Sequence, residues 1–349
     1  MIRSLEAVLA AVIPAQALGA LLLLRVRYCA DLLRAAALFA GRAPFLVGAA
    51  GAVVGYVALL VGCSASSGGV AESTTQRAAL VVRRDDDPGR AARRVAEIAR
   101  DVDVVYLGEH HDNPVHHAHQ LEILEALVAL GLRPTLAFEM LDGGQQGDVE
   151  RALAEPVSES ELSERLRWRA RGWPDFAMYY PLFALAARAR LPVVALDLDP
   201  AVTRRIAREG SAILGGERAA LVSLLPPDDA REAAIAREIR DGHCGLLPEA
   251  RVPTMVEAWH ARNVTMARRL AVALDRDDRA GPVVVIAGRG HQEPGGLPAQ
   301  LAALRPGTRQ LVVAMVEAAA GPGPENADVI WITPAVERGD PCAGLRAPR

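Results

Sequence analysis

The sequence contains no lysine, so its basic side chains are all arginine, 39 in number. We attribute this absence to codon bias rather than to chemistry. Aromatic residues are scarce at 4%, and a formal net charge of −3 gives no reason to expect a nucleic acid partner. No internal repeat is present. What remains is a chain of 349 residues that is 51% hydrophobic, which is enough for a sizeable packed core in one or two domains.

Residues 1–62 differ from the rest of the chain, because they hold two apolar stretches, Leu5–Leu24 and Phe45–Gly62, separated by arginines. Basic residues, an apolar segment and small residues before a cleavage point are typical of a secretory signal. The last small residue is followed by a cysteine, as in a bacterial lipobox, so we expect Cys63 to be lipidated. Residues 63–77 then comprise this cysteine and a small, polar linker.

Ser64 resembles signals that favour the outer membrane. The predicted location is therefore the bacterial cell envelope, with the protein anchored by lipid to the outer membrane and facing the periplasm. A plain transmembrane anchor with a chance cysteine is the alternative. Residues 1–40 are longer than a signal needs, and they are either an added membrane segment or the result of a start codon assigned too early.

Two cysteines, Cys244 and Cys342, remain in the exported chain. An even pair in an oxidising compartment is compatible with a disulfide. It is equally compatible with two buried thiols, so the sequence leaves both interpretations open.

Beyond residue 77, short apolar runs alternate with helical patterns, which predicts an α/β fold with a mainly parallel central sheet flanked by helices. The predicted strands are Val102–Leu107, Thr135–Met140, Val193–Leu198, Val283–Ala287, Leu311–Val316 and Val329–Thr333. Two charged, helix-rich insertions, at about 149–182 and 201–274, are expected to form a helical cap over one edge of the sheet. We predict a single domain over residues 78–342.

Five of the eight histidines lie within residues 106–120, directly after the first predicted strand. Asn113 is a good N-cap and Pro114 suits the first position of a helix that runs to about Leu130. The helix is expected to bury one face, formed by His117, Leu121, Leu124 and Val128. That places His117 beside the carboxyl end of the strand, where open α/β sheets bind ligands.

Polar residues also follow the other predicted strands. Glu109 and His111 follow the first strand, Glu139 ends the second, Asp197 ends the third, and His291 follows the fourth. In a parallel sheet these ends lie at one edge, so we expect the side chains to converge. Such a cluster can bind a divalent metal, with His111, Glu139 and His291 as ligands. It can also perform acid–base catalysis, with Glu109 added to these three.

Several short motifs are specific when their order and spacing along the chain are taken together. They are Gly108-Glu-His-His-Asp-Asn-Pro-Val-His-His117, Phe138-Glu-Met140, Gly172-Trp-Pro-Asp175 with Tyr179, His243-Cys-Gly245, Gly288-Arg-Gly-His291 and Asp340-Pro-Cys342. Together they resemble the ChaN-type haem-binding lipoproteins, which belong with the Tiki-like hydrolase superfamily. Members of this family are typically linked to haem or iron uptake. One departure is Asn263 in Trp259-His-Ala-Arg-Asn263, where the family usually has an aspartate, and this favours binding over hydrolysis.

The resemblance implies haem as the cofactor, and haem needs an apolar slot, an axial ligand and cations or N–H groups for its propionates. Tyr179 matches the family position and is the first candidate ligand, followed by Tyr180 and then His243. His117, at the positive start of a helix, would tend to stay neutral and able to bind metal. A homodimer that pairs two open haem faces is also implied.

Two functions from different classes follow. The preferred one is an exported, lipid-anchored haem-binding protein linked to haem or iron uptake. The alternative is a hydrolase of the Tiki-like type, either metal-dependent or based on histidine and glutamate side chains.

Overall fold

A computed structural model describes residues 79–155, 157–276, 278–318, 326–340 and 342–343. The predicted signal, the lipobox cysteine and the linker lie outside these residues. The described residues all belong to one compact unit, Gln76–Arg349. In this part of the chain, no helix combines the length and the apolar character needed to cross a membrane.

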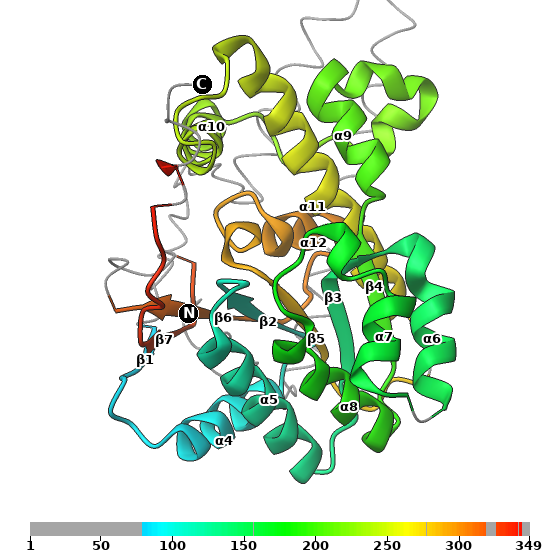
Figure 1. Cartoon of the computed structure of the whole chain (residues 1–349), viewed down its shortest axis with the longest axis vertical. Coiled ribbons are helices and arrows are strands. Elements are labelled where there is room, and N and C mark those ends of the chain that lie inside the picture. Colours follow the sequence, from blue (N-terminus) through cyan, green and yellow to red (C-terminus); the bar gives the residue numbers. More distant parts are fainter. Residues whose placement is uncertain (1–78, 156, 277, 319–325, 341, 344–349) are drawn as a thin grey trace, which may run out of the picture. The chain divides into compact units, whose positions relative to one another are not determined.

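The described strands form one parallel sheet in the order β1-β7-β6-β2-β5-β3-β4 (Figure 1). Their bounds are β1 Leu80–Val82, β2 Val104–Glu109, β3 Thr135–Asp142, β4 Val193–Asp197, β5 Val283–Gly288, β6 Gln310–Glu317 and β7 Val329–Thr333. β2, β3 and β5 are buried at every position, because helices cover both faces of the sheet. The predicted α/β class and parallel sheet are confirmed.

Helices cover the sheet on both faces, as Figure 1 shows. One face packs against α4 (Pro88–Ala99), α5 (Pro114–Ala129) and α8 (Tyr180–Ala189). The other face packs against the second half of α11 (Val252–Leu274) and against α12 (Leu297–Leu304). The sheet therefore lies between two apolar layers, and its carboxyl edge is left for polar residues.

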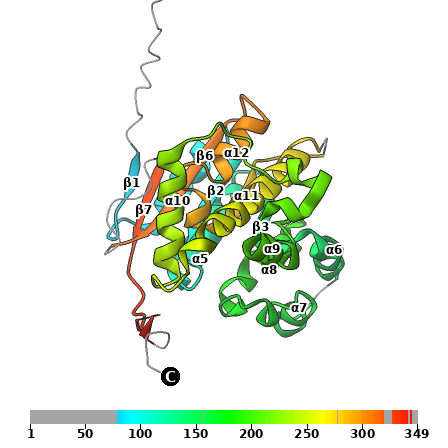
Figure 2. The ribbon, with the colours of Figure 1, turned by 90° about the horizontal axis from the view of Figure 1, so that it is seen from above.

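The two predicted insertions are helical in the structure. The first contains α6 (Gln146–Ala154) and α7 (Glu159–Arg165), and the second contains α9 (Pro200–Glu209) and α10 (Asp229–Gly242). α10 packs beside α11 (Figure 2) and buries Ile235 alone of its residues. The second insertion is more than a cap, because the C-terminal half of α11 covers the sheet.

The N-terminus of α5 follows the prediction, with the Asn113 side chain accepting a hydrogen bond from the Val115 N–H at 2.9 Å. Its buried face differs from the prediction, since Leu121 and Val128 are only half-buried. The buried positions are His116, His117, Gln120, Ile123, Leu124 and Leu127. Polar side chains occupy the first turns of this face because they find hydrogen-bond partners at the end of β2.

A disulfide joins Cys244, in the turn after α10, to Cys342 in the C-terminal segment. Of the two possibilities that the sequence leaves open, the structure therefore shows the bridge. The bond ties a helix of the second insertion to a part of the chain that follows the last strand.

Candidate functional site

A cleft of about 570 Å³ opens at the carboxyl edge of β2, β3 and β5. β2, β3 and β5 or the turns after them contribute Glu109, His110, His111, Glu139, Gly288, Arg289, Gly290, His291 and Glu293. α10 adds Glu238 and Asp241, and α11 adds Trp259 and Arg262. Of the residues predicted to converge from separate strand ends, Glu109, His111, Glu139 and His291 line this cleft, and Asp197 does not.

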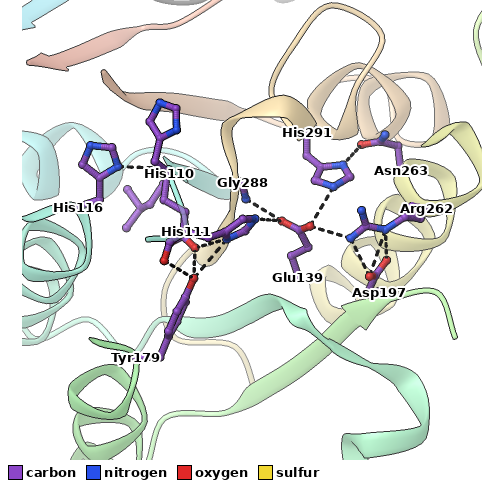
Figure 3. Close-up of polar contacts among 12 residues, drawn as sticks. His110, His111, His116, Glu139, Tyr179, Asp197, Arg262, Asn263, Gly288 and His291 are labelled. Atoms are coloured by element: carbon purple, nitrogen blue, oxygen red, sulfur yellow. Dashed lines mark hydrogen bonds and ion pairs between the residues drawn. The ribbon is translucent and has the colours of Figure 1, made fainter. Parts of the chain in front are cut away.

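Glu139 lies at the centre of the site and is buried (Figure 3). Its Oε1 accepts hydrogen bonds from Arg262 Nη2 at 2.7 Å and from His291 Nε2 at 3.1 Å. Its Oε2 accepts the Gly288 N–H at 2.7 Å. Burial alone would raise the pKa of Glu139, but the charges of His291, Arg262 and His111 hold it well below its ordinary value. Glu139 is therefore a carboxylate at neutral pH.

Arg262 connects Glu139 to Asp197, the residue that ends β4. Its Nε and Nη2 donate to both carboxylate oxygens of Asp197, at 2.8–3.2 Å. The sequence gives no signal for this role, because Arg262 is one of many arginines in an arginine-rich chain. It stands one residue before Asn263, within the motif where this chain departs from the family pattern.

His291 is oriented by Asn263, whose Oδ1 lies 2.9 Å from His291 Nδ1. The Asn263 Nδ2 donates to the Trp259 carbonyl at 2.9 Å, so its Oδ1 is left to accept the Nδ1 proton of His291. The contact of His291 Nε2 with Glu139 Oε1 at 3.1 Å gives the second ring nitrogen its partner, so the ring is held from both sides.

Glu109, at the end of β2, forms a second buried centre. Its Oε1 accepts hydrogen bonds from the Tyr179 hydroxyl at 2.6 Å and from His111 Nδ1 at 2.7 Å. Its Oε2 accepts from Gln120 Nε2 at 2.5 Å and lies 3.4 Å from His117 Nδ1. Burial would raise the pKa of Glu109, but the hydrogen bond from His111 and the charge of His117 outweigh it and lower the pKa.

His111 joins the two centres and faces the cleft. Its Nδ1 is held by Glu109, while its Nε2 lies 3.7 Å from Glu139 Oε2. The side chain is 29% exposed, and its ring meets that of Trp173 edge-on at 5.1 Å. Burial would lower the pKa of His111, but the charge of Glu139 and the hydrogen bond to Glu109 raise it to about 9.

Gly288 permits this close approach. A Cβ at this position would come within 2.6 Å of His111 Nε2, a distance that would force the imidazole to move. The glycine of the Gly-Arg-Gly-His motif is therefore required by its neighbours rather than by its own backbone conformation.

The four predicted cofactor-binding residues separate into two groups. His117 and Tyr179 lie behind Glu109, and burial together with the Glu109 charge raises the pKa of the Tyr179 phenol. Tyr180 donates to the Val157 carbonyl at 3.3 Å, and exposed His243 contacts the Ile239 carbonyl through Nδ1 at 2.6 Å. Neither Tyr180 nor His243 lines the cleft.

His110 lines the cleft although no role was predicted for it. Its backbone N–H donates to His116 Nδ1 at 2.9 Å, and His116 Nε2 donates to the Thr333 hydroxyl at 2.8 Å. Burial and the charge of His110 lower the pKa of His116 to about 3, so this ring stays neutral. His116 thus supports the turn that carries His110 and His111.

Among the described residues, no group of three or more His, Cys, Asp or Glu side chains is arranged to hold a metal ion. His111, Glu139 and His291 do meet, as the metal hypothesis requires. However, Glu139 already accepts hydrogen bonds at both oxygens, and His291 is bonded at both ring nitrogens. The predicted divalent metal is not supported.

Comparison with solved structures shows a fold shared with ChaN of Campylobacter jejuni. ChaN of Campylobacter jejuni, in a structure described as cofacial heme binding, is 19% identical with a TM-score of 0.53, and the match covers 67% of this chain and 93% of that one. The type III effector HopBA1 is 16% identical, with a TM-score of 0.40 and coverage of 73% and 97%. RRSP, a MARTX toxin effector domain from Vibrio vulnificus, is 18% identical, with a TM-score of 0.37 and coverage of 60% and 34%.

No curated protein matches the chain in sequence. A family model described as haem-binding uptake, Tiki superfamily, ChaN matches residues 95–301, which is more than half of the chain. This match spans β2 to α12 and includes Glu109, Glu139 and His291. It confirms the resemblance seen in the sequence motifs: the chain belongs to the ChaN family of haem-binding uptake proteins in the Tiki superfamily.

Proposed function

We propose that this protein binds haem in the cleft at the carboxyl edge of its sheet, with His111 as the side chain that faces the iron. Family membership supports the choice of ligand. The observation that carries the site is His111, a side chain that lines the cleft, with its Nδ1 bound by buried Glu109 and its Nε2 3.7 Å from Glu139 Oε2. Histidines that bind metals typically donate a hydrogen bond from the N–H of their other ring nitrogen to a carboxylate in this way.

The residues around the cleft suit a porphyrin in other respects. The Trp259 ring lines the cleft, and the Trp173 ring packs against His111. When bound, haem would supply an iron centre, and the His111 imidazole is the side chain that would hold it. His111 must release its Nε2 proton to serve in that role, because its pKa of about 9 keeps it protonated at neutral pH. Ligation is therefore favoured as the pH rises toward 9.

Tyr179 is the competing candidate for the iron ligand. Its hydroxyl is buried and donates to Glu109 at 2.6 Å, so ligation would require it to leave Glu109 and lose its proton. In the arrangement seen here, Tyr179 supports Glu109, which in turn orients His111. The two candidate ligands, His111 and Tyr179, therefore predict different effects of substituting each residue on haem binding.

The test is a haem titration of the full-length protein in detergent, followed through the Soret band. Wild type is expected to show a saturable change, His111→Ala to weaken binding strongly, and Tyr179→Phe to retain most of the affinity. His243→Ala, which removes an exposed histidine outside the cleft, is the matched control. A larger loss in Tyr179→Phe than in His111→Ala would transfer the ligand role to the tyrosine. If wild type shows no saturable change, the haem proposal fails.

We propose further that the protein is exported, acylated at Cys63 and attached to the outer membrane, where it takes part in haem or iron uptake. The lipobox pattern supports the anchor, and the Cys244–Cys342 disulfide suits an oxidising compartment. Cys63→Ser should release the protein from the membrane fraction or leave it unprocessed. Unchanged processing and retention would favour a plain transmembrane anchor.

A homodimer is proposed for the haem-bound state, because the cleft is open and a second copy would cover the outer face of the porphyrin. Light scattering should then show a doubling of the mass when haem is added to the protein. A mass that does not change with haem at saturation would contradict the dimer while leaving binding intact.

Hydrolysis is the second candidate function, and the observation that favours it is the convergence of Glu109, His111, Glu139 and His291 at one cleft. His111, held between two carboxylates, would act there as an acid, because its pKa is about 9. Haem-free protein should then hydrolyse a reactive ester such as p-nitrophenyl acetate, and His111→Gln should abolish the activity. Equal background rates for both proteins would remove this candidate.

A further inference from the structure

Two arginine side chains line the cleft, and their surroundings differ. Arg262 forms ion pairs with Glu139 and Asp197 through its Nε and Nη2. Arg289, in the turn after β5, makes no side-chain hydrogen bond or ion pair with any residue in the part of the chain that the structure describes. A half-buried guanidinium without a partner is unusual, because desolvation of a charge is costly unless a counter-group compensates it.

The backbone of Arg289 is held in a turn, while the space beside the next residue is open. The Arg289 carbonyl accepts the Gln292 N–H at 2.8 Å, which closes the short turn that carries the side chain. The next residue, Gly290, is exposed, and a Cβ there would meet no atom within 4 Å. A ligand group can therefore approach Arg289 from the cleft without displacing protein atoms.

Two carboxylates flank this arginine, one on α10 and one in the segment after β5 that also carries Arg289. Burial raises the pKa of Glu238 on α10 and of Glu293 after β5, and the charge of Arg289 opposes that rise at both. Neither carboxylate lies close enough to form an ion pair with Arg289. The arginine thus offers a fork of N–H donors to an anion, and the charges of Glu238 and Glu293 oppose that binding.

We propose that Arg289 receives one carboxylate of the ligand, which on the proposed function is a single propionate of haem. Guanidinium matches a carboxylate through two parallel N–H···O bonds, and this pairing would satisfy the donors that the protein leaves unpaired. The inference rests on haem as the ligand, and it assigns a specificity that iron ligation alone does not give: the free acid should be preferred over an esterified porphyrin.

The experiment compares haem with its dimethyl ester, in which both propionates are neutral, on the full-length protein in detergent. Wild type should bind the ester about tenfold more weakly than haem, the size expected for loss of a hydrogen bond to a charged group. Arg289→Gln should weaken haem binding to the same degree and leave ester binding unchanged. Arg237→Gln, an exposed arginine on α10 outside the cleft, is the control and should keep the wild-type preference.

A second variant probes the flanking carboxylates. Glu238→Gln removes a negative charge near Arg289, so it should strengthen haem binding and leave the ester unaffected. Equal affinities of wild type for haem and ester, or an equal loss of both in Arg289→Gln, would overturn the assignment while the haem function stands. Failure of wild type to bind either compound would end the proposed function and this inference together.

Discussion

Glu139 stabilises the site through both of its carboxylate oxygens, each of which accepts a donor from a different part of the chain. Replacing it with glutamine removes the charge that compensates half-buried Arg262 and the acceptor that His291 Nε2 contacts. We expect Glu139→Gln to lower the free energy of unfolding by about 2–4 kcal/mol, as for loss of one member of a buried ionic network. Urea denaturation measures the change.

The control for this substitution is Glu97→Gln, which neutralises an exposed glutamate on α4. That variant should unfold within about 0.5 kcal/mol of wild type, as is usual for surface positions. If the two variants were equally stable, the Glu139 network would contribute nothing to folding.

His111 should make stability depend on pH. Its pKa is raised from 6.5 to about 9 in the folded protein, so its proton stabilises the fold. This contribution is fully present below the unfolded-state pKa and is lost as the pH rises through 9, and its size is on the order of 3 kcal/mol. Denaturation of haem-free wild type between pH 6 and pH 10 should show this decline. His111→Gln should have a flatter profile, and an identical slope in both proteins would contradict the shifted pKa.

Sequence reasoning located Glu109, His111, Glu139 and His291 because each stands at or near the end of an apolar run. In a parallel sheet that position alone places them at one edge. It could not place Tyr179, whose hydroxyl meets Glu109 from 70 positions away. A tyrosine hydroxyl can serve either as an iron ligand or as a buried hydrogen-bond donor, and only the packing in the folded protein distinguishes these roles.

The stability of the N-terminus of α5 depends on Asn113. Its side chain caps the helix and also donates to Glu317 Oε1 at 2.7 Å and to the Pro334 carbonyl at 3.2 Å. Asn113→Ala should therefore cost more than an isolated cap, about 2–3 kcal/mol rather than about 1 kcal/mol. Ser158→Ala, which removes the exposed cap of α7, provides the comparison in thermal or urea unfolding. Equal losses of unfolding free energy in the two variants would show that the contacts of Asn113 with Glu317 and Pro334 do not contribute to stability.

The strands were largely predictable, because buried parallel strands are short, apolar and rich in β-branched residues. β1 was missed: it is only 3 residues long, and its residues are not all buried. The buried face of α5 was misplaced because His116 and Gln120, which are polar, occupy it through bonds to Thr333 and Glu109. Hydrophobic spacing cannot anticipate a face whose polar positions are satisfied by other elements.

The Cys244–Cys342 disulfide joins two segments of the molecule that are separated by 98 positions in the sequence. We expect the Cys244→Ser, Cys342→Ser double variant to lose about 2–4 kcal/mol of unfolding free energy, because a long loop is no longer closed in the unfolded chain. A reducing agent should lower wild type to the level of the variant and leave the variant unchanged. Insensitivity of wild-type stability to reduction would contradict the bridge.

The strand order has a further consequence for the time course of folding. β2 is the second described strand in the chain, yet both of its neighbours, β5 and β6, begin only at Val283 and Gln310. Until those residues have been synthesised, the backbone of β2 has no strand to pair with, and such distant pairings close slowly. The centre of the sheet therefore cannot assemble until β5 and β6 have been made. On the proposed route of export, this delay would keep the polypeptide extended enough to be threaded across a membrane before it folds.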